Sequence, residues 1–215
     1  MRQVYLLLFL FFGFNITYTQ QSQLFKAIEH LSEYIASDKF FEIRKNFGDI
    51  KATDSLYSEA IRFSEDDLSL ALLSLTFTTL PYRKVPIQIP FLKTIFYYPI
   101  VSVDEIKFLQ KNINLPRYFF YDSPNNAYVD KDKLAHFFGS AFLGYSFSFF
   151  DLTSYIGYFV EVIEDAFVLE ATIDKRDIKI NNYGKLFGDL LDEKKKIMPS
   201  EIIILYNIKY LRFAL

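Results

Sequence analysis

Three stretches in the second half of the chain decide how it folds: DKDKLAHFFGSAFLGYSF at residues 130–147, GYFVEVIEDAF at residues 157–167 and DKRDIKINNYGKLFG at residues 174–188. Each stretch is mostly apolar and carries a few acids, amides or a histidine at intervals of three or four residues. That interval places residues on one face of an α-helix. The sequence therefore predicts three helices with polar edges, and we expect these edges to meet in a shared interior.

In the first stretch, polar and small residues recur at every fourth position. Asp132 and His136 share one face of the predicted helix, and Ser140 and Gly144 continue that face. Phenylalanine and tyrosine fill the other sides, so the imidazole lies in a largely apolar setting where its protonation depends on its partners. With Asp132 to orient it, His136 is a candidate general base.

The second stretch carries three carboxylates, Glu161, Glu164 and Asp165, on one side of an otherwise apolar segment. Buried carboxylates are costly unless they are solvated, protonated, paired with cations or bound to a metal. The candidate catalytic residues are therefore Asp132, His136 and Glu161. The candidate ligands of a divalent metal are His136, Glu161, Glu164 and Asp165. No cofactor is expected beyond such an ion.

The third stretch has a ridge formed by Asp177, Asn181, Gly184 and Gly188, at offsets of 4, 7 and 11 residues. Glycine inside a helix costs about 1 kcal/mol relative to alanine. Two glycines on one ridge therefore indicate that another helix, or a ligand, comes close to the backbone there. We expect this ridge to be a structural part of the polar centre.

Taken in order, the motifs DK-x-x-HF (132–137), E-x-x-E (161–164) and D-x-x-x-N-x-x-G-x-x-x-G (177–188) resemble the VanZ-like proteins. They also resemble the related YfiM-type family of predicted periplasmic lipoproteins. The resemblance covers about residues 130–190 and implies an envelope location and a shared helical core, without a defined reaction. The chain departs from both patterns, because VanZ-like proteins are polytopic and commonly carry Gln at the position of Glu164. It also lacks the lipidated cysteine of the YfiM-type family.

Composition limits the classes of function that the chain can have. Its 215 residues favour a single domain, and a hydrophobic content of 51% is ample for a core. A net charge of −2 leaves no basic surface for a nucleic acid, so no nucleic-acid partner is expected. The absence of cysteine excludes disulfides, thiolate metal sites and cysteine nucleophiles.

The N-terminus has the pattern of a secretory signal peptide. Arg2 precedes an apolar run at 4–14, and Thr17 and Thr19 are suitable small residues before a cleavage site at Gln20. The predicted organisation is a signal peptide at 1–19 and one helical domain at 20–215, located outside the cytoplasm in the periplasm or cell envelope. An uncleaved N-terminal anchor is the alternative, because the uncharged stretch continues long enough to span a bilayer.

The rest of the chain predicts a mainly α fold, a compact bundle of about six or seven helices with a proline-rich irregular middle. An amphipathic pattern over 23–46 predicts a helix with a break at Ser37-Asp38. Ser64 is the predicted cap of an apolar helix at 68–80. Six of the seven prolines lie within 81–124, which interrupts regular helices there. The final segment, 201–215, suits either a strand or a docked helix.

Three classes of function are compatible with these patterns. The first is a cell-envelope protein with a structural or interaction role that contacts the membrane surface or an envelope component. It is favoured because the chain lacks the common catalytic motifs. The alternative is a metal-dependent or histidine-based hydrolase acting on lipid-linked or cell-wall substrates. The third is a protein that binds a hydrophobic ligand, suggested by 25 Phe and 16 Tyr.

Overall fold

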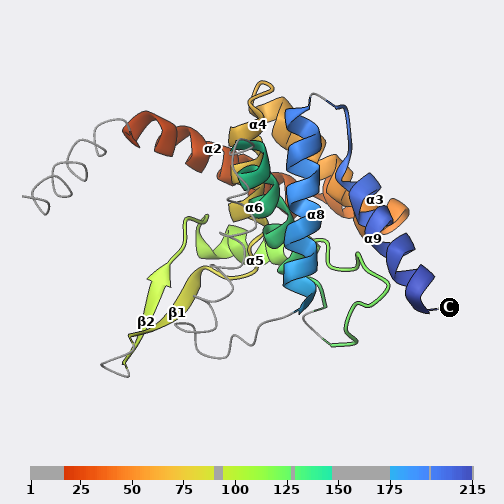
Figure 1. The fold of residues 1–215 in the computed structure, drawn as a ribbon. Helices are drawn as coiled ribbons and strands as arrows, with labels where there is room; N and C mark the ends of the chain where they lie inside the picture. Colours follow the sequence, from red (N-terminus) through yellow and green to blue (C-terminus); the bar gives the residue numbers. More distant parts are fainter. Residues whose placement is uncertain (1–16, 90–93, 127–128, 147–174, 194, 215) are drawn as a thin grey trace, which may run out of the picture.

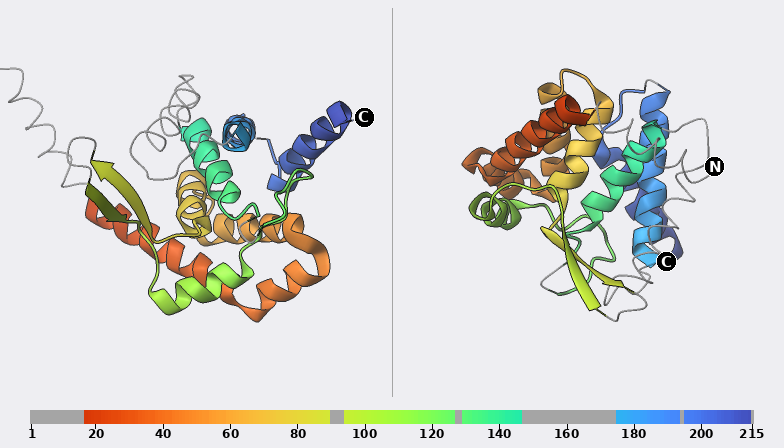
Figure 2. Two further views of the ribbon diagram at one scale, coloured as in Figure 1. Left: turned by 90° about the horizontal axis from the view of Figure 1, so that it is seen from below. Right: turned by 90° about the vertical axis from the view of Figure 1, so that its left-hand side faces the viewer.

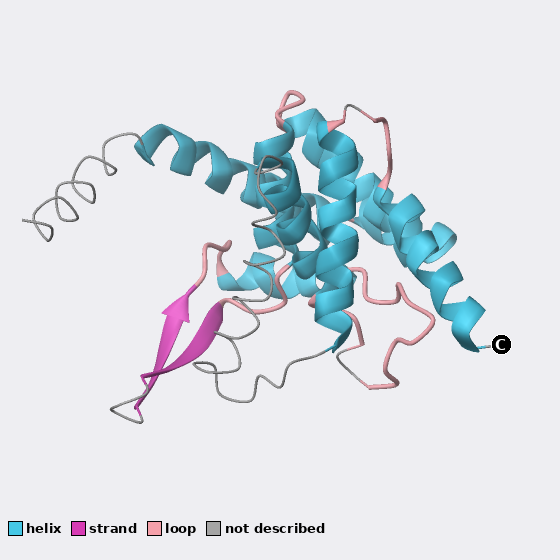
Figure 3. Ribbon diagram, in the orientation of Figure 1, coloured by secondary structure: helices cyan, strands magenta, loops and turns pink. Residues whose placement is uncertain are grey.

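The structure is a computed structural model that describes residues 17–89, 94–126, 129–146, 175–193 and 195–214. Within these residues it is mainly helical, with one two-stranded hairpin (Figures 1 and 3). The predicted fold class is confirmed. The elements are α2 (Thr17–Ala36), α3 (Asp38–Phe63), α4 (Leu68–Thr79), β1 (Lys84–Ile89), β2 (Thr94–Pro99), α5 (Glu105–Asn114), α6 (Lys133–Ser146), α8 (Lys175–Asp192) and α9 (Pro199–Ala214).

Capping residues set the ends of the first helices. The predicted break at Ser37-Asp38 is confirmed, since the Ser37 hydroxyl accepts a hydrogen bond from the Phe40 backbone N–H and starts α3. The predicted cap at Ser64 is wrong. Ser64 ends α3, and the Asp67 carboxylate caps α4 instead by accepting from the Leu70 N–H at 3.0 Å. The chain turns between the two helices through left-handed backbone, which leaves Asp67 as the last extended residue before α4.

The proline-rich middle forms the antiparallel hairpin β1–β2, which projects from the helices (Figure 3), followed by α5 and a long loop. A carboxylate from α3 holds that loop on the bundle. Asp49 accepts hydrogen bonds from the backbone N–H groups of Arg117 and Tyr118, both at 2.8 Å, and pairs with Arg44 at 2.6 Å. The backbone N–H groups of this irregular loop thus find their hydrogen-bond acceptor in a side chain rather than in a sheet or a helix.

Helix α6 lies between α4 and α8 (Figure 2), and the main hydrophobic core surrounds it. Phe137 and Phe138 of α6 are fully buried. The ring of Phe137 lies 5.4 Å from that of Phe187 on α8. Further core residues come from α2, α3, α4 and α9, among them Leu31, Leu56, Leu72 and Ile203. This burial of apolar surface is the main stabilising term of the bundle.

The backbones of α6 and α8 come unusually close at two glycines of α8. A β-carbon placed on Gly184 would lie 2.2 Å from the carbonyl oxygen of Phe137, and one on Gly188 would lie 2.2 Å from that of Ala141. From the other side, a β-carbon on Gly144 would lie 2.9 Å from the Lys185 carbonyl oxygen. It is therefore helix α6 that lies over the glycine ridge of α8.

The C-terminal segment is a helix, so the structure decides between the two forms that its sequence allowed. The Asp54 carboxylate of α3 accepts the Ser200 N–H at 2.9 Å and satisfies a free donor in the first turn of α9. None of the helices in the described ranges is both long enough and apolar enough to cross a membrane.

Lys111 on α5 is a fully buried lysine that caps another helix. Its ammonium donates to the carbonyl oxygens of Thr78, at 2.6 Å, and Leu80, at 2.9 Å, at the C-terminal end of α4. A cation is favourable at that end of a helix dipole. Burial nevertheless lowers the pKa of the Lys111 ammonium to about 7.

Replacing Gly188 with alanine should lower the free energy of unfolding by about 1–3 kcal/mol, the usual cost of overpacking a core. The added methyl group would overlap the Ala141 carbonyl oxygen and force α6 away from α8. Urea denaturation measures the change. Gly139→Ala is the matched control on α6, because its methyl group would meet only the Thr76 side chain, at 3.2 Å. Equal stability of the two variants would contradict the close packing.

Replacing Lys111 with methionine should flatten the dependence of stability on pH between about pH 7 and pH 10. In that window an unfolded lysine, with a pKa of 10.5, is protonated while the native amine is largely neutral. The free energy of unfolding of the natural protein should therefore rise with pH, by up to about 1.4 kcal/mol per pH unit. Lys107→Met, on the same helix but paired with Glu29 and Glu33 at the surface, should keep this slope.

Candidate functional site

The candidate site lies where the first turns of α6 and α8 face each other. The two helices run in the same direction, and their polar edges pair in register: His136 with Asp177, and Ser140 with Asn181. The Ser140 hydroxyl and the Asn181 side-chain oxygen are 3.0 Å apart, one helical turn beyond the charged residues. Two polar edges that are 41 residues apart in the sequence therefore form one line along the contact between α6 and α8.

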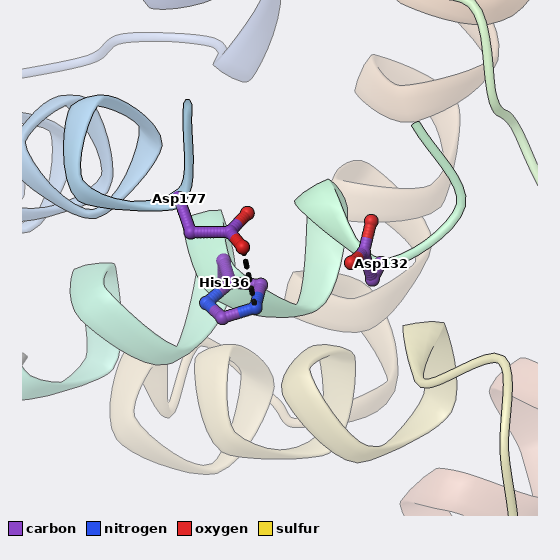
Figure 4. Close-up of side chains that lie close together, drawn as sticks. All are labelled: Asp132, His136 and Asp177. Carbon is purple, nitrogen blue, oxygen red and sulfur yellow. Dashed lines mark ion pairs between the residues drawn. The ribbon is translucent and has the colours of Figure 1, made fainter. Parts of the chain in front are cut away.

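Four ionisable residues form a compact cluster at the start of this line. Lys133 Nζ makes a close ion pair with Asp177 Oδ1 and lies 3.4 Å from Asp132 Oδ1. His136 Nε2 lies 3.9 Å from Asp177 Oδ2 (Figure 4). Asp132 directly precedes α6, and its backbone carbonyl accepts the His136 N–H at 3.2 Å. The first turn of α6 thus fixes three of the four residues, and α8 supplies the fourth.

Burial controls the electrostatics of the cluster. The Asp177 residue is 8% exposed, and this burial raises the pKa of its carboxyl group, while the neighbouring His136 and Lys133 act to lower it. The net direction is upward. A buried carboxylate is expensive without nearby positive charge, so the position of Lys133 is a direct consequence of the burial of Asp177.

A second ion cluster holds the beginning of α8 in place. Arg176 Nη2 lies 2.6 Å from Asp130 Oδ1 and 3.5 Å from Asp122 Oδ1. Asp130 is fully buried and also accepts the Ser123 hydroxyl, and Asp122 accepts the Tyr206 hydroxyl of α9 at 3.2 Å. Arg176 is next to Asp177 in the sequence, so these contacts fix the backbone that carries the site carboxylate.

The first cluster also has the donor atoms of a metal site. One imidazole nitrogen of His136 and one carboxylate oxygen each from Asp132 and Asp177 lie within 4.8 Å of one another. Nitrogen together with carboxylate oxygen is a donor set that divalent transition metals accept. The same imidazole, flanked by a carboxylate, has the arrangement of a general base.

The structure places the predicted site residues as follows. Asp132, His136 and Asp177 come together, Asn181 lies one turn further along α8, and Gly184 and Gly188 hold α6 against it. Glu161, Glu164 and Asp165 lie outside the described residues, so their predicted roles as catalytic or metal-binding residues stay predictions.

Sequence reasoning did not assign a role to three of the ionic residues. Lys133 belongs to the DK-x-x-HF motif, yet its charge was not connected with Asp177. The pairing of Arg176 with Asp130 was also missed. The available signal was the alternation of acid and base in DKDK at 130–133, which is unusual at the start of an apolar helix.

We compared the chain with models of protein families, with curated proteins and with solved structures, and none of the three comparisons gave a match.

Proposed function

We propose that the protein works outside the cytoplasm, at the cell envelope, in a structural or interaction role. The main support is the charge matching of its polar centre. Asp177 is paired with Lys133, and the fully buried Asp130 is paired with Arg176. In this proposal the two pairs specify where α8 lies against α6 and the preceding loop, because a different arrangement would leave a buried charge without its partner.

The resemblance to VanZ-like and YfiM-type proteins is part of this proposal. Two of the three motifs that carry the resemblance supply the polar edges that face each other between α6 and α8. The third, E-x-x-E at 161–164, lies outside the described residues. A shared helical core in such proteins would need these positions to keep two helices in register. The envelope location depends on the N-terminal pattern of residues 1–19.

The membrane surface or an envelope component is the proposed partner. Two helices present apolar side chains to solvent: α5 through Ile106, Leu109 and Ile113, and α9 through Ile204, Leu205 and Ile208. Exposed apolar rows of this kind mark surfaces that contact membranes or other proteins. They support an interaction role for the folded domain.

A metal-dependent or histidine-based hydrolase is the second candidate. One observation favours it: the His136 side chain is 16% exposed and lies beside two carboxylates whose oxygens could hold a metal. This candidate requires an ion, or an attacking water, in contact with His136.

A double-mutant cycle on Lys133 and Asp177 tests the structural role. Lys133→Met or Asp177→Asn alone should cost about 3–5 kcal/mol in the free energy of unfolding, because each leaves a buried partner uncompensated. The double variant should recover part of that loss, with a coupling energy of about 1–3 kcal/mol. Urea denaturation of the four proteins measures it.

The control is the pair Lys185–Asp189 within α8, with a separation of 2.8 Å and more exposed side chains. Its coupling should stay within the range of surface pairs, about 0.2–1 kcal/mol. If the Lys133–Asp177 coupling is no larger than that of Lys185–Asp189, the pair does not organise the fold and the structural role is lost.

The location is tested by expressing the full chain in a Gram-negative bacterium and sequencing the N-terminus of the product. We expect a mature protein in the periplasm or at the membrane that begins at Gln20. Leu8→Arg, which interrupts the apolar run, should leave the precursor in the cytoplasm. Full-length natural protein in the membrane fraction would identify the N-terminus as an anchor, and accumulation in the cytoplasm would contradict the proposal.

A further inference from the structure

In the described part of the chain, two carboxylates share one ammonium at the start of α6 and α8. Asp132 and Asp177 contribute two carboxylates, and Lys133 is the cation that contacts both. Carboxylates in such a partly buried site favour nearby positive charge, and a bound cation is a second source of it beside the lysine.

Two of the three ligand side chains are partly exposed to solvent. The side chain of Asp132 is 31% exposed and that of His136 is 16% exposed, whereas those of Asp177 and Lys133 are 11% and 5% exposed. Among the described residues, Asp132 and His136 thus form the more exposed side of the site, and Asp177 of α8 forms its more buried side. Sites of this form, with protein ligands on one side, are typical of metals that retain open positions.

The three ligand residues lie at the starts of two helices whose backbones are closely packed. Asp132 and His136 are four residues apart at the start of α6, and Asp177 lies in the first turn of α8. The glycine contacts between these helices leave little freedom to move one against the other. Arg176, adjacent to Asp177, is anchored to Asp130. The three donor atoms therefore need only small side-chain rotations to converge on one ion.

We propose that Asp132, His136 and Asp177 bind one divalent transition-metal ion, such as Zn²⁺, which displaces the Lys133 ammonium from the two carboxylates. The imidazole nitrogen excludes a preference for Ca²⁺, which takes six to eight oxygen ligands, and for Mg²⁺, which prefers oxygen and water. Two carboxylates and one imidazole instead suit Zn²⁺, Mn²⁺ or Co²⁺. The lysine and the metal are alternative counter-ions for the same oxygens.

This inference does not depend on the envelope location or on any reaction. The metal site and the proposed structural role both involve the Lys133–Asp177 pair, but separate experiments can disprove each of them. The structural role is lost if the pair shows no coupling in metal-free protein, whereas the metal site is lost if no ion binds.

The direct test is titration of the full-length, chelator-treated protein with Zn²⁺ and Co²⁺ by calorimetry and by the visible absorption of Co²⁺. We expect one ion per chain and negligible binding of Ca²⁺. His136→Gln should weaken Zn²⁺ binding more than the roughly 10–100-fold typical of losing an outer hydrogen-bond partner, since it removes a ligand. Asp189→Asn, which changes a carboxylate of α8 outside the site, should leave the affinity unchanged.

Lys133→Met provides an independent readout. In the absence of metal this variant should melt at a lower temperature than the natural protein, because two carboxylates lose their cation. Zn²⁺ should then raise its melting temperature more than that of the natural protein, since no lysine competes for the oxygens. In the double variant Lys133→Met/His136→Gln, Zn²⁺ should no longer raise the melting temperature.

Two results would overturn the inference. The first is the absence of stoichiometric Zn²⁺ or Co²⁺ binding by the natural protein. The second is binding that survives both His136→Gln and Asp132→Asn, which would place the ion elsewhere. If Lys133→Met does not fold even with metal present, the titrations of the natural protein and of His136→Gln still decide between binding and no binding.

Discussion

The contact between the backbones of α6 and α8 is the constraint on which the rest of this structure depends. At Gly184 and Gly188 there is no room for a side chain, because the carbonyl oxygens of α6 occupy the space where a β-carbon would be. Only glycine permits so short a distance between two helices. The cost in helix propensity is offset by the close packing of the rings of Phe137 and Phe187 on the neighbouring faces.

The short distance between the helices in turn determines the electrostatics of the centre. It removes Asp177 from solvent and brings it within reach of Lys133 and His136. A carboxylate in such a position requires a cation, and the lysine one residue before the apolar part of α6 provides it. The same charge arrangement holds the helices together and also offers oxygen and nitrogen atoms to a metal ion. The proposed structural role and the proposed ion binding therefore rest on one geometry.

The remaining elements fix this pair of helices from outside. Helix α4 packs on the opposite side of α6, and its C-terminal carbonyl groups are held by Lys111 of α5. The loop after α5 is tied to α3 by Asp49 and to α8 by the contact of Asp130 with Arg176. The loop after α5 is thus held to the core by charged side chains rather than by regular backbone hydrogen bonding.

The sequence by itself determined the polar edges of α6 and α8, because the positions that share a helix face follow from a local period of 3.6 residues. It also determined that the proline-rich middle would contain no long helix, since proline interrupts helices, whereas the hairpin β1–β2 and helix α5 found there were not part of the predicted irregular segment. The partners of these residues depended on the tertiary structure. That Asp177 meets Lys133, that Arg176 meets Asp130 and that Lys111 is buried at the end of α4 depend on how elements far apart in the chain are placed. No local pattern encodes that placement, because it results from the packing of the whole core.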